Sequence, residues 1–590
     1  MKLNLGRFFA FILFVSSLPA LAKVTYHLDV NDPEHHLAEV TATFTAPKQA
    51  KTLTLQLPAW RSGRYEILDL ANGIRDFEVT DRQNKSLSWQ KVDKSSWQIQ
   101  LNGRKKITVK YQVYANQLSY RSRHIDETHA FIDASGFFLY SQALRHQPVD
   151  VSLTIPKHWD SISGMESGGG KHRFVAPNYD ILVDSPIEAG VFERYAFKSA
   201  GVDFELAIWG EGNYDGQQMA DDLAKMVTTA NSIWQGTPFK RYVFMVHATT
   251  NVRGATEHIN STIIQRKRFT FAPRDQYLEF LATAAHEYVH TWNVKTYRPQ
   301  GLTPYDYQNE NYTQLLWIAE GSTSYLEYQL LLRAGLITAE EYFEELAREI
   351  FEHDHTPGRL QQAIAEASFD KWIGERGDRA HNSQVNIYDE GALLSLLLDL
   401  QIIEQSRAKK SYRDIHNALY QDHPLPKGYT VDDVKQILKD VTGKDYNKWW
   451  NNYIDRAKAL EFDDALASVG LKIEAEATGY DLGIMYVMQG DMTVIKQVVK
   501  DSAAWQAGLT PEDVILTIDG LRLYPNTLEA RVNHASKQDS IELALFRRDA
   551  IITKTVNMVE EKPTRYRIVK VRKPTARQKA NYKKWIGLDF

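Results

Sequence analysis

The chain changes its hydrophobic periodicity twice, and this feature restricts the possible folds more than any other. From Val24 to about Pro186 apolar and polar residues alternate, as in HLAEVTATF and KTLTLQL, which is typical of strands with one buried face. From about residue 195 short strands give way to helical spacing, as in TAEEYFEELAREIFEH, and strands return near Glu461. We therefore predict a multidomain α+β protein that begins with an antiparallel β-sandwich.

The same changes place the domain boundaries. We expect the N-terminal β-sandwich at residues 23–186, a mixed domain with a helical lobe at 187–460 and a strand-rich module at 461–560. A basic tail at 561–590 follows, which from Lys562 onward has ten lysines and arginines and the single acid Asp589. We interpret this tail as a solvated or docked extension rather than as a site for an anionic partner. The formal net charge of −4 also gives no reason to expect nucleic acid as a partner.

The first residues predict export from the cytoplasm. Lys2 and Arg7 precede an apolar run from Phe8 to Val15, and Ala20–Ala22 supplies the small residues that a signal peptidase requires. We expect a signal peptide at residues 1–22 and a periplasmic or secreted mature chain that begins at Lys23. The apolar run is too short to span a bilayer and no later segment is long and apolar enough, so we expect no membrane span in the mature chain.

A metal site is indicated by the stretch AAHEYVHTWN, residues 284–293. His286 and His290 are four residues apart, so on a helix both imidazoles project from one side and can bind the same ion. Glu287 is rotated by about 100° from His286, which leaves it beside the ion as a base for metal-activated water. Because the chain has no cysteine, only His, Asp and Glu side chains are available as strong ligands.

A third ligand is needed, because a bare H-E-x-x-H also arises by chance in a chain with 18 histidines. The apolar stretch LWIAEGSTSYLEY contains Glu320, whose carboxylate would be unfavourable to bury unless it were paired or bound to metal. Gly321 behind it predicts a close approach of two helices. We expect one Zn²⁺ per chain, bound by His286, His290 and Glu320. The alternative for Glu320 is an exposed residue on a surface helix.

These motifs carry a family resemblance. HEYVHTWN followed by LWIAEGSTSY resembles the glycyl aminopeptidase family of zinc metallopeptidases, in which two His and one Glu bind zinc, and the resemblance covers nearly the whole mature chain. It implies a thermolysin-like peptidase domain. LTLQLPAWRSGRYEILDLA resembles the N-terminal signature of that family, although Arg61 and Ser62 stand where Thr-Pro is usual. NIYDEGALLSLLLDL resembles the segment that supplies the catalytic tyrosine, here Tyr388, with Glu390 where a lysine is common.

The resemblance also implies a substrate-binding segment in RGATEHINS. Glu257 matches the glutamate that holds the α-ammonium group of the substrate, and Gly254 and Ala255 are expected beside it. The family more often has Gly and Leu where Ala255 and Thr256 stand. The resemblance therefore supports the type of reaction more directly than it supports a preference for Gly or Ala at the N-terminus of the substrate. Because predicted strands flank this stretch, we expect a loop or sheet edge.

The implied reaction is removal of N-terminal residues from peptides. Zinc would polarise a water and the scissile carbonyl, Glu287 would transfer the proton, Tyr388 would stabilise the oxyanion and Glu257 would select a free N-terminus. Two alternatives remain: a zinc endopeptidase, or a peptide-binding adaptor whose peptidase domain is vestigial. For the individual residues, the alternatives are a solvated loop carboxylate for Glu257 and a core tyrosine on a Leu-rich helix for Tyr388.

The C-terminal module resembles a PDZ domain. KDSAAWQAGLTPEDVILTIDG, from Lys500 to Gly520, is similar to the segment in which a small-residue helix leads into a strand that ends in Asp-Gly. Upstream, Leu482, Gly483 and Ile484 would form the loop whose N–H groups receive a peptide C-terminus beside an exposed strand edge. The alternative is a module that packs on the catalytic domain and binds no ligand.

Overall fold

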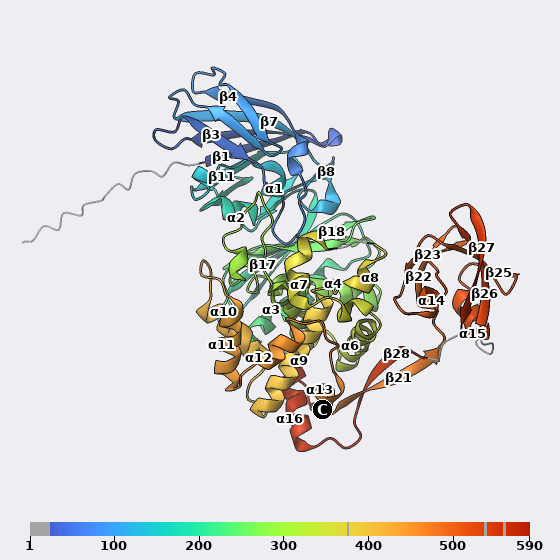
Figure 1. The fold of residues 1–590 in the computed structure, drawn as a ribbon. Coiled ribbons are helices and arrows are strands. Elements are labelled where there is room, and N and C mark those ends of the chain that lie inside the picture. The colour runs from blue at the N-terminus through green and yellow to red at the C-terminus, as the bar shows by residue number, and fades with distance from the viewer. Residues whose placement is uncertain (1–23, 375–376, 536–539, 558–561) are drawn as a thin grey trace, which may run out of the picture. The chain divides into compact units, whose positions relative to one another are not determined.

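The computed structural model describes residues 24–374, 377–535, 540–557 and 562–590 (Figure 1). The expected signal peptide at residues 1–22 lies outside this range. By their internal contacts the residues divide into two compact units. The first comprises Met1–Pro58, Leu70–Asn116 and Arg123–Ala189, and the second comprises Ala59–Asp69, Gln117–Ser122 and Gly190–Phe590. Two short segments from within the N-terminal β-rich sequence therefore belong to the second unit, which the periodicity did not reveal.

The first unit is the β-sandwich that the alternating pattern predicts. Burial alternates residue by residue along β2 (Leu37–Thr45) and β7 (Lys106–Tyr114), as a strand with one face on a core requires. One sheet has the order β13-β14-β11-β1-β2-β7-β4, and two smaller sheets have the orders β12-β15-β10-β9-β8 and β3-β6-β5. β1 pairs with β11 in parallel, so the sandwich is not purely antiparallel as expected.

The remaining elements of this part of the chain are short. They are β1 (Val24–Asp32), β3 (Thr52–Gln56), β4 (Ile74–Asp81), β5 (Trp89–Asp93), β6 (Ser96–Gln100), β8 (Asn116–Gln117), β9 (Arg123–Ile125), β10 (His129–Ile132), α1 (Ala134–Phe137), β11 (Val149–Thr154), β12 (Asp160–Ser163), β13 (Glu166–Ser167), β14 (Arg173–Ala176), α2 (Tyr179–Val183) and β15 (Ile187–Gly190).

The second unit starts with a mixed sheet. Its order is β16-β17-β18-β20-β19, from the strands β16 (Phe192–Ser199), β17 (Val202–Trp209), β18 (Arg241–Thr249), β19 (Gly254–Glu257) and β20 (Ser261–Lys267). β18 lies parallel to both β17 and β20, which buries it on both faces and explains its continuous apolar run. β19 is the edge strand and pairs antiparallel with β20, so the segment RGATEHINS lies at a sheet edge as predicted.

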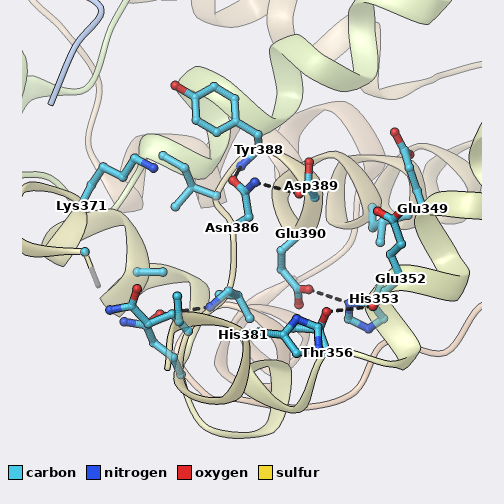
Figure 2. A pocket seen from close by; sticks show the side chains of 18 of the residues that line it. Glu349, Glu352, His353, Thr356, Lys371, His381, Asn386, Tyr388, Asp389 and Glu390 are labelled. Atoms are coloured by element: carbon cyan, nitrogen blue, oxygen red, sulfur yellow. Dashed lines mark hydrogen bonds and ion pairs between the residues drawn. The ribbon is translucent and has the colours of Figure 1, made fainter. Parts of the chain in front are cut away.

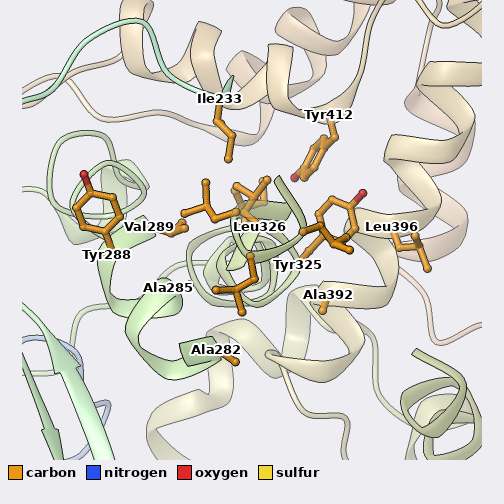
Figure 3. Close-up of a cluster of buried hydrophobic side chains, with 14 of the residues drawn as sticks. Ile233, Ala282, Ala285, Tyr288, Val289, Tyr325, Leu326, Ala392, Leu396 and Tyr412 are labelled. Atoms are coloured by element: carbon orange, nitrogen blue, oxygen red, sulfur yellow. The ribbon is translucent and has the colours of Figure 1, made fainter. Parts of the chain in front are cut away.

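Helices supply most of the core of the second unit. They are α3 (Gly216–Thr228), α4 (Arg274–Val289), α5 (Ser322–Arg333), α6 (Ala339–Asp354), α7 (Ile364–Phe369), α8 (Ala380–Ser383), α9 (Asp389–Ser406), α10 (Tyr412–Asp422), α11 (Val431–Thr442), α12 (Asn447–Tyr453), α13 (Asp463–Ala467) and α16 (Ala576–Ile586). Figure 3 shows part of this core, in which Ala285 and Val289 of α4 lie near Leu326 of α5. The buried stripe of α4 thereby fixes which face of that helix is left for other contacts.

The C-terminal module has a separate core. Its elements are β22 (Ile484–Gln489), β23 (Met492–Val498), α14 (Ala503–Gln506), β24 (Val514–Ile518), β25 (Leu521–Arg522), α15 (Leu528–Ala535), β26 (Ser540–Arg547) and β27 (Ala550–Asn557). A two-stranded ribbon of β21 (Leu471–Gly479) and β28 (Lys562–Lys570) leads to and from it (Figure 1). Phe462 and Leu466 pack in the larger core, so the module starts later than the expected residue 461.

Of the two forms expected for the basic tail, solvated or docked, the structure shows the docked one, as part of the second unit. α16 buries Tyr582, Trp585 and Ile586 in the helical core. The side chain of Arg413 donates hydrogen bonds to the carbonyl oxygens of Lys584 and Trp585, which caps the end of α16. Within the described ranges, the structure has no helix that is both long and apolar enough to cross a membrane.

Candidate active site

Three ligand atoms converge where α4 meets the turn before α5. His286 lies in the last turn of α4 and His290 caps its C-terminus. Glu320 lies in a π-helical turn, Trp317–Gly321, a distortion that is frequent at functional sites. The Nε2 atoms of His286 and His290 are 3.0 Å apart, and Glu320 Oε2 is 3.8 Å from the first and 3.2 Å from the second. The predicted zinc ligands are thus brought together.

The tautomers of the two histidines indicate that a cation belongs between them. His286 Nδ1 lies 2.8 Å from the Glu327 carboxylate, and His290 Nδ1 lies 2.9 Å from the Asn293 carbonyl oxygen. Both oxygens only accept, so the proton of each neutral ring is on Nδ1 and each Nε2 presents a lone pair. Two lone pairs and a buried carboxylate facing one another fit a divalent metal ion. These residues therefore fit zinc.

Two glycines allow the π-helical turn to approach α9. A Cβ atom on Gly321 would lie 2.4 Å from the Cα atom of Gly391, and one on Gly391 would lie 2.9 Å from the Cα atom of Gly321. No larger residue fits at either position without backbone movement, so the close approach of two helices predicted from Gly321 is confirmed. The approach brings the start of α9, where Tyr388 is the N-cap, next to the zinc ligands.

Glu287 is a buried carboxyl group with a free oxygen. It is 6% exposed, and its Oε2 atom accepts no hydrogen bond from any residue that the structure describes. Burial raises the pKa of the Glu287 carboxyl to about 7. For Glu320, burial alone would also raise the pKa, but the charges of His290 and His286 hold it well below its usual range. The two carboxyl groups therefore suit different tasks, one as a proton carrier and one as an anionic ligand.

Glu257 lies at the end of the edge strand β19 and is 5% exposed. The buried Lys295 lies 3.7 Å from Glu257 Oε1 and donates a hydrogen bond of 2.8 Å to Ser62 Oγ. A Cβ atom on Gly63 would lie 2.2 Å from Glu257 Oε2, so the turn that contains Gly63 packs directly on this carboxylate. Burial is the main cause of the raised pKa of both Glu287 and Tyr388, and the charge of Glu257 raises both further, which places the three side chains in one electrostatic site.

The strand before Glu257 is covered by one arginine. Arg121 Nε donates a hydrogen bond of 2.9 Å to Thr256 Oγ1. A Cβ atom on Gly254 would lie 2.3 Å from Arg121 Nη1, so only glycine fits at this position, and Ala255 is half-buried. The guanidinium group therefore lies in the space that a Cβ atom on Gly254 would need.

Tyr388 borders a cavity of about 1150 Å³. Its ring centroid is 6.1 Å from that of His286, and Lys371 Nζ lies 5.4 Å from the centre of its ring (Figure 2). Burial and the nearby Glu320 raise the pKa of Tyr388 well above its usual value, so its hydroxyl group stays protonated. Glu390, which stands where the family often has lysine, pairs with His353 at 2.7 Å.

The same cavity extends to the C-terminal module, where Asp481, Ile484 and Val499 line it. β22 is an edge strand of the described sheet, so its open side is available for pairing with a peptide. Gly483 has φ +74°, and its N–H group donates a hydrogen bond of 2.8 Å to Asp481 Oδ1. One of the amides expected to receive a peptide carboxylate is thus paired with a side chain of the loop itself.

Four residues of the site were not predicted as such. Tyr65 donates a hydrogen bond of 2.5 Å to Glu320 Oε1, and Glu327 and Asn293 orient the two histidines. Lys295 contacts Glu257. Glu327 could have been found, because it follows Glu320 by seven residues on an apolar helix and so lies on the same face. No local pattern singles out Tyr65 or Lys295.

Comparison with solved structures gives a full-length match. An aminopeptidase N family protein from Idiomarina loihiensis is 27% identical, with a TM-score of 0.89, over 95% of this chain and 100% of that one. An M1 zinc metallopeptidase from Deinococcus radiodurans is 14% identical, with a TM-score of 0.48, over 75% of this chain and 95% of that one. Among curated proteins, no sequence is significantly similar.

Three family models match the sequence. The Peptidase M61 N-terminal domain matches residues 25–191, M61 glycyl aminopeptidase matches residues 279–394 and the PDZ domain matches residues 494–531. The second match contains the three converging ligands and Tyr388, and the third lies in the C-terminal module. The chain therefore combines matches to the N-terminal and catalytic domains of the M61 glycyl aminopeptidases with a C-terminal PDZ domain, and it is a zinc metallopeptidase of the aminopeptidase type.

Proposed function

We propose that the enzyme removes small N-terminal residues, Gly or Ala, from peptides, and that water activated beside zinc is the nucleophile. The observation that carries this proposal is the buried Glu257, which shares one electrostatic site with Glu287 and Tyr388. A carboxylate at this depth suits a substrate with a free α-ammonium group, because that group adds a charged hydrogen bond to the carboxylate beside its ion pair with Lys295.

The proposed mechanism assigns one task to each residue. Zinc bound by His286, His290 and Glu320 would supply Lewis-acid polarisation of the scissile carbonyl and lower the pKa of a water molecule. Glu287 Oε2 accepts the proton of the attacking water and delivers it to the leaving amine. The hydroxyl group of Tyr388 donates a hydrogen bond to the oxygen on which negative charge develops.

The preference for a small first residue is supported by the two groups that lie next to the Glu257 carboxylate. Arg121 covers the strand that carries Glu257, and Gly63 packs on the carboxylate from the other side. Both neighbours also line the cavity of about 1150 Å³, so a first side chain of the substrate would lie against Arg121 and the turn at Gly63. The family resemblance supports the same preference.

Blocking the substrate amine tests the role of Glu257. We expect an N-acetylated aminoacyl chromophore to be cleaved at least about 100-fold more slowly than the free amine, because the carboxylate loses its charged partner. Glu257→Ala is expected to lower kcat/KM for the free amine by roughly 10- to 100-fold, the size of one charged hydrogen bond, while zinc content stays unchanged. Equal cleavage of acetylated and free substrates by the wild-type enzyme would instead favour an endopeptidase.

We propose a second role for the PDZ domain, which is to hold the C-terminus of longer substrates. A peptide that pairs with β22 would place its carboxylate at the loop of Leu482, Gly483 and Ile484. This proposal is supported by the shared cavity, since Ile484 lines the same space as Tyr388. Holding a substrate there would raise its effective concentration near the zinc ligands without changing the chemistry.

Amidated peptides and two matched glycine variants test this role. We expect KM to be about 10-fold higher for a C-terminally amidated peptide than for its free acid, because one charged hydrogen bond is lost. Gly483→Ala should abolish this difference. For a one-residue chromogenic substrate, KM should be the same in the wild-type enzyme and in the variants. Gly490→Ala is the control, because Gly490 also has a positive φ, of +60°. It lies at the opposite end of β22, and a Cβ atom there would have open space around it. No difference between the paired peptides on the wild-type enzyme would refute the role.

A further inference from the structure

A hairpin in the first unit brings together two histidines and an aspartate that no motif above includes. The sequence HIDETH, residues 124–129, forms the end of β9, the turn and the start of β10. Asp126 Oδ1 accepts hydrogen bonds of 2.8 Å from the N–H group of Thr128 and 3.0 Å from that of His129. These bonds fix the carboxylate, and they leave Asp126 Oδ2 at 3.9 Å from His124 Nδ1.

The two imidazoles face each other in the interior. His124 Nδ1 lies 2.9 Å from His129 Nε2, and His129 Nδ1 lies 2.8 Å from Glu188 Oε1 of β15. His129 and Glu188 are almost fully buried, at 0% and 1% exposure, and His124 is 8% exposed. Because the carboxylate of Glu188 accepts, Nδ1 of a neutral His129 carries the proton and Nε2 presents a lone pair to His124.

This arrangement shares two features with the zinc ligands in the active site, and the ligand atoms of His124, Asp126 and His129 all lie within 4.8 Å of one another. There, too, two imidazole nitrogens lie 3.0 Å apart, and a carboxylate lies 2.8 Å from the second nitrogen of one ring. Two ligands of a tetrahedral zinc ion are about 3.3 Å apart, since each zinc to nitrogen bond is about 2.0–2.1 Å long. A carboxylate on the other ring nitrogen is the usual support for a metal-binding histidine. Glu188 occupies this position for His129, as Glu327 does for His286.

We propose that the first unit holds a second zinc ion, bound by His124 Nδ1, His129 Nε2 and Asp126 Oδ2, with Glu188 orienting His129. Two imidazoles and a carboxylate are a donor set that suits zinc. A divalent cation also balances the charge of the two carboxylates that share this region. The site links β9 to β10 and, through Glu188, to β15, so zinc binding stabilises the first unit. The chain then carries two zinc ions, not the one that the H-E-x-x-H motif predicts.

Metal content of active-site variants tests the second site without altering it. We expect two zinc ions per wild-type chain and one in His290→Ala, measured by mass spectrometry of protein purified without chelators. His290→Ala combined with His124→Gln should bind none. The matched control combines His290→Ala with His172→Gln, another histidine of the first unit that hydrogen-bonds Ser161, and should keep one ion.

A second readout does not require the first unit to tolerate substitution. In the His290→Ala protein, zinc added at 100 times its dissociation constant should raise the unfolding free energy by about 2.7 kcal/mol, seen as a higher Tm that EDTA reverses. Cobalt in the same variant should give the visible absorption of a nitrogen- and oxygen-bound ion. The proposal would be overturned if the wild-type chain held one zinc ion, the His290→Ala chain held none, and added zinc left the Tm of His290→Ala unchanged. His124 and His129 would then form only a hydrogen bond with each other.

Discussion

Glu287→Gln is expected to lower kcat by about 1,000-fold, within the 10² to 10⁴ range of a lost general base, while the zinc content of the active site is unchanged. The amide keeps the shape of the side chain but cannot accept and return a proton. The free Oε2 atom of Glu287 and its pKa of about 7 are the structural basis for this expectation. The measurement is kcat on an aminoacyl chromophore, together with the metal content of each protein.

Glu279→Gln is the matched control for that variant. Glu279 lies on α4 two turns before Glu287, and its side chain is 48% exposed and paired with Arg253 and Arg266. Its substitution should leave kcat within about twofold, because Glu279 contacts none of the three ligand atoms and the buried Arg266 also donates a hydrogen bond to the carbonyl oxygen of Gln276. If Glu287→Gln retained more than a tenth of wild-type kcat, another group would have to act as the base.

Glu320→Ala is expected to remove zinc from the active site and to abolish hydrolysis. Only His286 and His290 would remain as ligands, and the hydroxyl group of Tyr65 would lose its acceptor. Zinc affinity, measured by competition with a chelator, should fall below detection for this site. The second zinc site proposed in the first unit should keep its ion, so the content of the chain should fall by one equivalent.

Glu327→Gln provides a graded comparison. Glu327 contacts His286 Nδ1 and is not among the three converging ligand atoms, so its loss should weaken zinc binding by about 10- to 100-fold without abolishing it. If Glu320→Ala bound active-site zinc as tightly as the wild type, Glu320 would be only a buried partner of the two histidines, and the ligand assignment would be wrong.

Much of the metal centre could be predicted because it depends on local geometry. The spacing of His286 and His290 places both rings on one side of α4 whatever that helix packs against, and Gly321 indicated the close approach to α9. The alternation of burial along β2 and the apolar run of β18 likewise followed from period alone. The π-helical form of the turn at Glu320 was not predictable, since no spacing in the sequence distinguishes it from an α-helical turn.

Residues that act through long-range contacts were not visible in the sequence. Tyr65 is 255 positions from Glu320, and Lys295 is 233 positions from Ser62, yet each pair is hydrogen-bonded. Nothing in the spacing of either residue encodes these contacts. The basic tail shows the same limit, because its composition left open whether it is solvated or docked, while in the structure Trp585 is buried and Arg333 and Arg413 donate hydrogen bonds to its carbonyl oxygen.

By itself, the sequence determined which residues are available for metal chemistry and which segments are strands or helices, because side-chain type and hydrophobic period are local properties. Only the tertiary structure decided that residues 59–69 join the second unit, that Lys295 contacts Glu257, and that His124 and His129 lie against Glu188. The physical reason is that burial and packing set these contacts. A side chain in the interior is placed by the elements that enclose it, and those elements come from distant parts of the chain.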